Sequence, residues 1–152
     1  MKFEENWKKL EVVKGITLGE LCVSRAYDGA MDDNYLWWLA HEDVRENLSI
    51  VASSLEILKF RLPPDNQIQI TSCLRCPKCN EAVGGAKKSL HMQGLAVDMV
   101  APHIEDVWYL LTEECWYLFE YVYWYRQRKF IHAAIHIGLP PLPDITQFII
   151  KR

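Results

Sequence analysis

The sequence predicts an α+β fold in which a small antiparallel sheet is flanked by helices. Apolar side chains recur at helical spacing over residues 44–58, which predicts one long amphipathic helix. Shorter segments show strand-like alternation or a high content of β-forming residues, namely 67–71, 95–100, 116–125 and 130–137. Helical and strand-like segments gather in separate parts of the chain, which is typical of the α+β class.

Length and composition bound the organisation of the chain. Half of the 152 residues are apolar, which is enough for one hydrophobic core, and the chain is too short for two ordinary domains. We therefore expect a single domain over residues 1–152, with a charged lead-in at 1–14 and a proline-interrupted tail at 138–152. We also expect a monomer.

Charge and hydropathy disfavour several classes of protein. The chain has a formal net charge of −3 and a pI of about 5.9. Nucleic-acid binding would need a basic face to offset phosphate charge, so this class is not expected. No stretch approaches the roughly 18 apolar residues of a membrane span, and the N-terminus lacks the apolar core of a signal peptide. We expect synthesis in a cytoplasm, and the odd number of cysteines, 5, fits a reducing compartment.

The N-terminal part of the chain predicts small elements before the long helix. Residues 10–13 are typical of an edge strand. Thr17 can cap a short helix, and Glu20 three residues later completes a capping box. The polar segment 28–34 contains glycine and predicts a loop, and a short aromatic segment follows at 35–40.

Prolines and glycines separate the elements in the middle of the chain. Pro63 and Pro64 end the long helix, since proline cannot continue it. The strand at 67–71 follows a short polar turn. Pro77 suits the first turn of a further helix, which ends by Gly84.

The C-terminal part predicts a helix and a hairpin. An amphipathic helix opens near His103. The aromatic strand at 116–125 is followed by a polar turn and a returning strand at 130–137. The apolar residues 148–150 predict an additional edge strand.

The segment from Ser89 to Asp98 carries the residues with the clearest chemical meaning. His91 and Asp98 are two of the ligand types of a catalytic zinc, which takes three protein ligands and a water. Their separation is too long for one helix face but suits a turn leading into a strand, and Gly94 lets the backbone bend. A carboxylate in an apolar strand is costly unless it is paired or bound to a metal. We therefore predict that His91 and Asp98 bind a metal.

The third ligand is expected on a neighbouring strand. His132 and His136 both lie in the predicted strand at 130–137. Because side chains alternate along a strand, the two histidines share one face. Either of them can therefore point at the metal.

The pattern Ser-x-His-x-x-Gly-x-Ala-x-Asp at residues 89–98 resembles the zinc-binding signature of the M15 peptidases. This family includes D-alanyl-D-alanine carboxypeptidases and endolysins, and it shares its fold with Hedgehog signalling domains. Upstream positions that also match are Ser72, Arg75, Pro77, Asn80, Val83, Gly84 and Gly85. Positions that depart from the family are Cys73, Leu74 and Cys76, where glycine, an aromatic residue and serine are usual.

The resemblance implies a Hedgehog/DD-peptidase-like fold with a Zn²⁺ cofactor held by His91, Asp98 and a third histidine. In relatives a basic turn precedes the last ligand, and residues 128–134 fit that ending best. His132 is therefore the implied third ligand, with His136 as the alternative. Bound zinc would lower the pKa of its water to about 7 and so supply hydroxide at neutral pH.

The resemblance also implies roles for three further residues. Glu120, expected opposite His132 across the hairpin, would take the proton from the zinc-bound water. Some relatives have an acidic residue at the position of Lys129 instead. Arg75 would bind a substrate carboxylate or stabilise the developing oxyanion, because its planar guanidinium suits both. Ser89 would hydrogen-bond near the substrate.

The expected function is that of a zinc metallopeptidase that hydrolyses a peptide bond in the stem or cross-bridge peptides of bacterial peptidoglycan, as a carboxypeptidase or an endopeptidase. A small domain without a signal peptide suggests a phage or virus enzyme, which is released at lysis or carried in a virion, and a cytoplasmic recycling enzyme would also fit. The alternative is a zinc-stabilised domain of the same fold that binds a partner without cleaving it, as Hedgehog domains do.

Cys73, Cys76 and Cys79 form a C-x-x-C-x-x-C run. Val83 stands where an iron–sulfur ferredoxin would carry a fourth cysteine. A structural zinc site would need a second cysteine pair, which the sequence lacks. We therefore interpret the three cysteines as small, replaceable residues.

Overall fold

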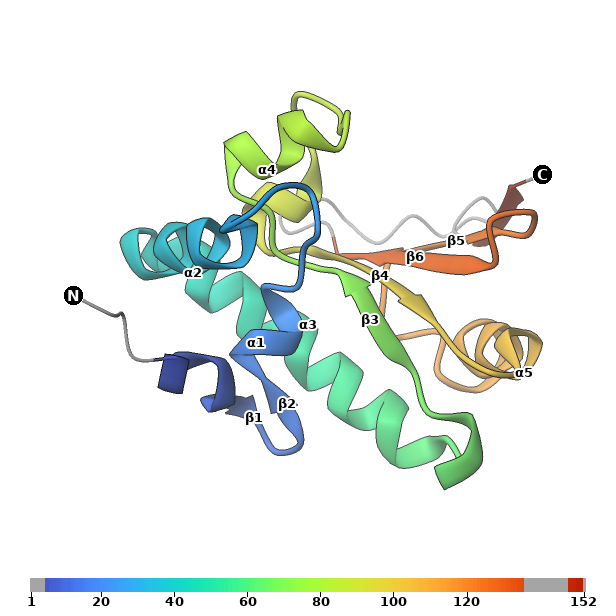
Figure 1. Ribbon diagram of the computed structural model, residues 1–152. Coiled ribbons are helices and arrows are strands. Elements are labelled where there is room, and N and C mark those ends of the chain that lie inside the picture. Colours follow the sequence, from blue (N-terminus) through green and yellow to red (C-terminus); the bar gives the residue numbers. More distant parts are fainter. Residues whose placement is uncertain (1–4, 136–147, 152) are drawn as a thin grey trace.

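The computed structural model describes residues 5–135 and 148–151, and its architecture is the expected α+β class (Figure 1). The strands are β1 (Glu11–Val13), β2 (Ile16–Thr17), β3 (Gln69–Ser72), β4 (Ala96–Val100), β5 (Tyr121–Tyr125), β6 (Phe130–Ala134) and β7 (Phe148–Lys151). The α-helices are α1 (Leu18–Leu21), α2 (Ala30–Ala40), α3 (Glu42–Arg61), α4 (Pro77–Ala82) and α5 (Ile104–Tyr109). Short 3₁₀ turns lie at Glu5–Lys9, Pro64–Asn66 and Leu90–Gln93.

The main sheet has the strand order β3-β4-β6-β5-β7. The pairs β3–β4, β4–β6 and β6–β5 are antiparallel, whereas β7 pairs in parallel with the outer edge of β5. The edge strand predicted at residues 148–150 therefore lies within β7. The register places His132 of β6 between Asp98 of β4 and Tyr123 of β5, which sets the geometry of the site.

Helix α3 forms where the apolar residues recur at helical spacing, as the sequence predicts. Its buried side chains are Val44, Leu48, Val51, Ala52, Ser54, Leu55 and Leu58. Apart from Ser54, they share one hydrophobic core with Val97 and Met99 of β4 and Ile131 of β6. The helix ends at Arg61, before Pro63. None of the helices in the described ranges is long and apolar enough to cross a membrane.

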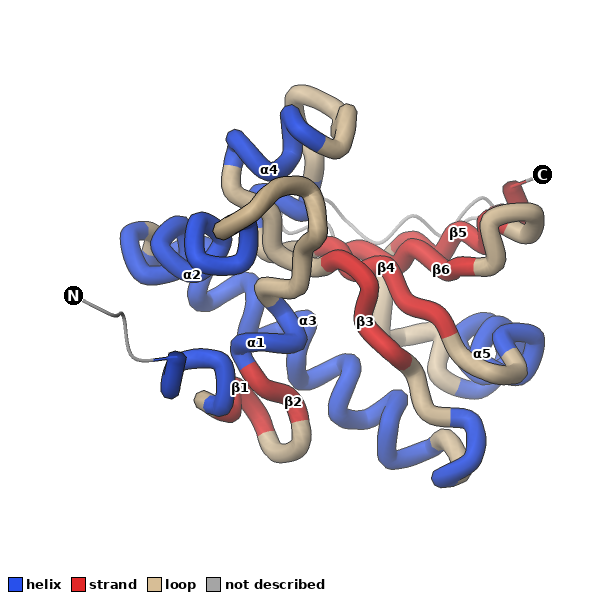
Figure 2. The backbone as a smooth tube through the Cα atoms, in the orientation of Figure 1, coloured by secondary structure: helices blue, strands red, loops and turns tan. Residues whose placement is uncertain are grey.

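The helices that follow β3 and β4 lie toward opposite ends of these antiparallel strands (Figure 2). Helix α4 follows the C-terminal end of β3, and the C-terminal end of β4 leads toward α5. The predicted start of α4 at Pro77 is confirmed. The connection from α4 to β4 therefore lies at the end of the sheet where β3 ends and β4 begins.

The predicted capping box at the start of α1 is confirmed. The Glu20 N–H donates to Thr17 Oγ1 at 3.2 Å, and the Thr17 N–H donates to the Glu20 carboxylate at 2.8 Å. These two bonds satisfy backbone donors that the first helical turn leaves without partners. The strand predicted at 10–13 is also present, as β1 in a hairpin with β2.

Helix α2 corrects the prediction of a loop at 28–34. The helix begins at Ala30, directly after Gly29, and continues through the aromatic segment. Gly29 has a φ of 86°, a conformation that glycine adopts at little cost. Ala30 and Asn34 are the buried residues of this helix, so its sequence shows no apolar stripe that would reveal it.

The aromatic segment at 116–125 is a strand only from Tyr121 onward, which corrects its predicted start. After α5 the chain forms a π-helical turn at Leu110–Glu114 and then turns again before β5. Trp116 and Tyr117 are 57% and 59% exposed in this connection. Aromatic residues favour strands, so composition alone extended the predicted strand too far.

Candidate metal centre

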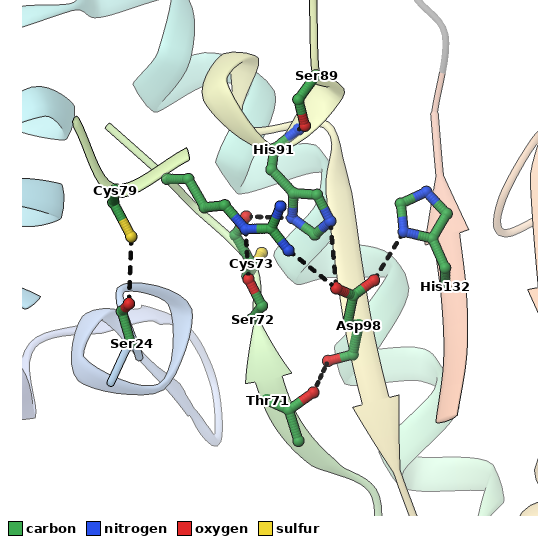
Figure 3. Close-up of polar contacts among 10 residues, drawn as sticks. Ser24, Thr71, Ser72, Cys73, Cys79, Ser89, His91, Asp98 and His132 are labelled. Carbon is green, nitrogen blue, oxygen red and sulfur yellow. Dashed lines mark hydrogen bonds and ion pairs between the residues drawn. The ribbon is translucent and has the colours of Figure 1, made fainter. Parts of the chain in front are cut away.

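Three side chains from separate elements converge on one point of the sheet (Figure 3). His91 lies in the turn Leu90–Gln93, Asp98 lies within β4, and His132 lies within β6. The register pairs Asp98 with His132, whose Nδ1 is 2.7 Å from Asp98 Oδ1. His91 Nε2 lies 3.4 Å from Asp98 Oδ2. The fold therefore brings together the three residues that the sequence predicts as ligands.

The donor atoms of this triad fit a metal ion. One nitrogen or oxygen of each residue lies within 4.8 Å of those of the other two. Ligand atoms about 2.0 Å from a tetrahedral zinc are roughly 3.3 Å apart, and His91 Nε2 and Asp98 Oδ2 are 3.4 Å apart. Within residues 5–135 and 148–151, this is the one group of three metal-binding side chains at such spacing. Two imidazoles and a carboxylate, with room for water, suit Zn²⁺.

His91 is held in one orientation by the backbone of the preceding loop. Its Nδ1 lies 2.7 Å from the Cys73 carbonyl oxygen. A carbonyl oxygen only accepts hydrogen bonds, so Nδ1 carries the proton and donates, which leaves Nε2 free to bind a metal. Ser89 acts on the turn itself, because its Oγ accepts from the His91 N–H at 3.3 Å. Ser89 also lines the pocket around the site.

Arg75 supports two of the three ligands. Its Nη2 donates to Asp98 Oδ2 at 3.1 Å, and its Nε donates to Ser72 Oγ at 2.8 Å. Its backbone N–H donates to the His91 carbonyl oxygen at 3.1 Å. The side chains of Arg75 and Asp98 are only 15% and 14% exposed. The guanidinium is therefore largely occupied in orienting the ligand set.

The protonation states match those that a metal requires. Burial lowers the pKa of His91, so the imidazole is neutral near pH 7. Burial acts to raise the pKa of Asp98, but the neighbouring imidazoles, above all the hydrogen bond from His132, outweigh it and hold the pKa well below its usual range. Metal binding needs a neutral imidazole and an ionised carboxylate, so these two groups are ready to ligate at neutral pH.

We expect the metal-free protein to lose stability as the pH falls below about 6.5, the ordinary pKa of histidine. The folded state keeps His91 neutral to lower pH than the unfolded chain does. The unfolded state therefore binds more protons in this window, and acid shifts the equilibrium toward it. Urea unfolding of metal-free protein at pH 7 and pH 5 measures the loss.

The His91→Gln variant should show a weaker pH dependence, because it lacks the titrating group. His103→Gln, which alters an exposed histidine, is the control and should behave as the wild type does. An unchanged pH dependence in His91→Gln would contradict the assignment.

The triad lies in a pocket of about 510 Å³. Its lining residues are Arg75, Val83, Gly84, Gly85, Ala86, Ser89, Leu90, His91, Asp98, Tyr125, Arg128, Phe130 and His132. One wall is aromatic, because the rings of Tyr125 and Phe130 stack with centroids 4.5 Å apart. The glycine turn after α4 contributes another wall. The pocket is therefore large enough for part of a peptide next to the candidate ligands.

The glycine turn explains two of the sequence positions that match the M15 pattern. A Cβ at Gly85 would overlap Asn80 Oδ1, so a larger residue does not fit there without movement of the Asn80 side chain. Asn80 accepts from the Gly85 N–H through its backbone carbonyl at 2.8 Å, and its Nδ2 donates to the Ala86 carbonyl oxygen at 2.9 Å. Asn80 and Gly85 thus fix the loop that borders the pocket.

The sequence analysis expected Glu120 opposite His132, but the structure does not place it there. Tyr123 occupies that position, and its ring stacks on the imidazole of His132 with centroids 6.0 Å apart. Glu120 precedes β5, where its N–H donates to the Ala134 carbonyl oxygen at 3.0 Å. It is not among the residues described as lining the pocket. Its role as proton acceptor stays a prediction from the resemblance.

Sequence reasoning missed several residues that shape the site. The Cys73 carbonyl contributes through its backbone, which no side-chain pattern reveals. Tyr123 and Tyr125 were foreseeable, because they alternate on β5 and so share the face that carries His132 across the hairpin. Arg128 was read only as part of a basic turn, yet its side chain lines the pocket.

Two further predictions concern His136 and the cysteines. His136, the alternative third ligand, lies outside the described residues. Cys76 caps α4, where its Sγ accepts from the Cys79 N–H at 3.3 Å, and Cys79 Sγ lies 3.1 Å from Ser24 Oγ. Cys73 is fully buried next to the His91 loop. These cysteines are packing and capping residues.

Comparison with known proteins places this site in a family. A family model described as Peptidase M15 matches residues 15–134, which is most of the chain. The matched span contains all three candidate ligands and every described residue that lines the pocket. No curated protein matches the chain at a significant level. The chain belongs to the peptidase M15 family.

Proposed function

We propose that the protein is a zinc-dependent metallopeptidase that hydrolyses a peptide bond in the stem or cross-bridge peptides of bacterial peptidoglycan. The observation that carries the proposal is the convergence of His91, Asp98 and His132 in a pocket, in a chain of the peptidase M15 family. The ligand chemistry suits zinc. The substrate class comes from the resemblance to cell-wall peptidases.

The residues of the site have separate roles in the proposed reaction. Zinc, when bound by the triad, supplies a water that is activated near neutral pH. The Cys73 carbonyl keeps His91 in the tautomer that ligates through Nε2. Arg75 holds Asp98 in place and lies close enough to the ligands to stabilise negative charge on a substrate carbonyl oxygen. Tyr123 stacks on His132 and limits the rotation of its ring.

The proposed mechanism also needs a proton acceptor. Asp98 is the single carboxylate among the described residues of the pocket, and the proposal uses it as a ligand. Glu120 is proposed as the base on the resemblance alone. This shortage of a second carboxylate favours the alternative proposal, in which the domain keeps its zinc and binds a peptide without cleaving it.

Mass spectrometry of soluble muropeptides incubated with the purified protein tests the proposal. We expect a cleavage product that disappears with a zinc chelator and returns when zinc is added, and its mass identifies the bond. The Asp98→Asn protein is the matched control and should give no product. Stoichiometric zinc without cleavage of any muropeptide would contradict the peptidase proposal. It would support the alternative, a zinc-stabilised domain that binds a peptide without cleaving it.

A further inference from the structure

We infer that Arg128 binds a carboxylate of the substrate, so that the protein acts on peptides with a free carboxylate about one residue from the cleaved bond. The inference rests on the proposed function and adds a specificity residue to it. Arg128 lies in the turn between β5 and β6, outside the segment that resembles the zinc-binding signature. Its side chain nevertheless lines the same pocket as the three candidate ligands.

The turn and the ring of Phe130 restrict the position of the Arg128 side chain. The Lys129 N–H donates to the Arg126 carbonyl oxygen at 3.3 Å, and Lys129 has a φ of 57°, so the turn is tight. Arg128 Cζ lies 5.3 Å from the ring centroid of Phe130. That ring stacks in turn on Tyr125. A cation held over an aromatic ring loses less freedom when it binds a ligand.

The two arginines of the pocket differ in whether their guanidinium groups are free to bind a substrate. Arg75 is mostly buried and already bonded to Asp98 and Ser72. Arg128 is exposed and has no acidic partner among the described residues. Asp98 is the single carboxylate that the described pocket contributes. The two guanidinium groups therefore exceed the one carboxylate in charge, a bound divalent metal would add to this excess, and positive charge attracts an anionic ligand.

The distance along β6 from Phe130, whose ring lies next to Arg128, to the candidate ligand His132 fits a carboxylate near the cleaved bond. Phe130 and His132 share one face of β6 and are two positions apart, roughly 7 Å along the strand. One extended peptide residue covers about 3.5 Å, and a guanidinium–carboxylate hydrogen bond adds about 2.8 Å. A peptide whose carbonyl lies at the triad can therefore present a carboxylate to Arg128, whose planar guanidinium can donate two parallel hydrogen bonds to it.

The experiment varies the substrate carboxylate and the arginine together. The probes are N-acetyl-D-alanyl-D-alanine and its C-terminal amide, given to zinc-loaded protein. We expect kcat/KM for the carboxylate to exceed that for the amide by about 10- to 100-fold in the wild type, the range for a charge-assisted hydrogen bond. Arg128→Gln should remove this preference, so that the ratio of the two kcat/KM values falls to about one. Arg128→Lys should restore part of the preference.

Arg126→Gln is the matched control, because Arg126 lies in the same turn but its guanidinium is over Trp124 at 4.9 Å and not in the pocket. It should keep the full preference. A preference that persists in Arg128→Gln, or a wild type without any preference between hydrolysed probes, would overturn the inference.

A binding measurement separates this inference from the proposed function. If zinc-loaded wild type hydrolyses neither probe, calorimetric titration with the same two peptides decides the role of Arg128. Tighter binding of the carboxylate that is lost in Arg128→Gln supports it, even if the muropeptide assay shows no peptidase. Equal binding of the two probes, or no binding by the wild type, refutes the carboxylate site and leaves the peptidase proposal to the muropeptide assay.

Discussion

Asp98→Asn is expected to empty the metal centre and abolish hydrolysis. The amide keeps the shape of the side chain but lacks the charge that contacts both His91 and His132. We expect bound zinc to fall from about one ion per chain to nearly none. Activity should fall by more than about 100-fold, because losing a partner outside the ligand set alone typically costs 10- to 100-fold. Elemental analysis of the purified protein and the muropeptide assay measure the two effects.

The control for this variant is Asp106→Asn, which alters an exposed carboxylate in the first turn of α5. It should keep its zinc and its activity. Stoichiometric zinc in Asp98→Asn would show that the carboxylate is not a ligand. The same analysis identifies the third ligand, because His132→Ala should lose zinc and His136→Ala should retain it. The opposite result would assign the ligand to His136.

Gly94→Ala is expected to destabilise the fold by at least about 2 kcal/mol, the upper end of the cost of a left-handed residue. Gly94 has a φ of 73°, and an added Cβ would lie 2.9 Å from the Val44 carbonyl oxygen of α3. That contact is with backbone, so the helix and the His91 turn must move apart. Urea unfolding of the metal-free protein measures the loss.

Gly15→Ala separates the two causes of this loss. Gly15 has a φ of 78°, but an added Cβ there meets nothing within 4 Å. It should therefore show only the conformational cost of about 1–2 kcal/mol. Equal losses in the two variants would mean that the close approach of Gly94 to α3 does not matter. Zinc affinity should fall only in Gly94→Ala, because the Gly94 N–H contacts the His91 carbonyl oxygen.

Residues whose role depends on local chemistry could be predicted from the sequence. The spacing of His91, Gly94 and Asp98 indicates a turn entering a strand, and the helix with apolar periodicity is present. Glu120 was misplaced because its position depends on the hairpin register. That register follows from where β5 begins, and an aromatic-rich segment does not mark that point.

Other parts of the fold leave no signal in the sequence. Helix α2 buries too few side chains to show a period. The contact of His91 with the Cys73 carbonyl is made by backbone, which any residue at position 73 would supply. Both features depend on packing between residues that are far apart in the sequence. A pattern within a short sequence segment does not contain that information.

The turn that carries His91 is tied to two helices, and this has a practical consequence for metal exchange. Trp37 Nε1 donates to the Met92 carbonyl oxygen at 2.9 Å, and Asn47 Nδ2 donates to the Gln93 carbonyl oxygen at 3.0 Å. These bonds fix the histidine through the fold itself, unlike the ligands of a zinc finger, which order only on binding. We therefore expect that zinc can be removed and replaced while the protein stays folded. Cobalt, whose spectrum reports coordination geometry, becomes a usable probe of this centre.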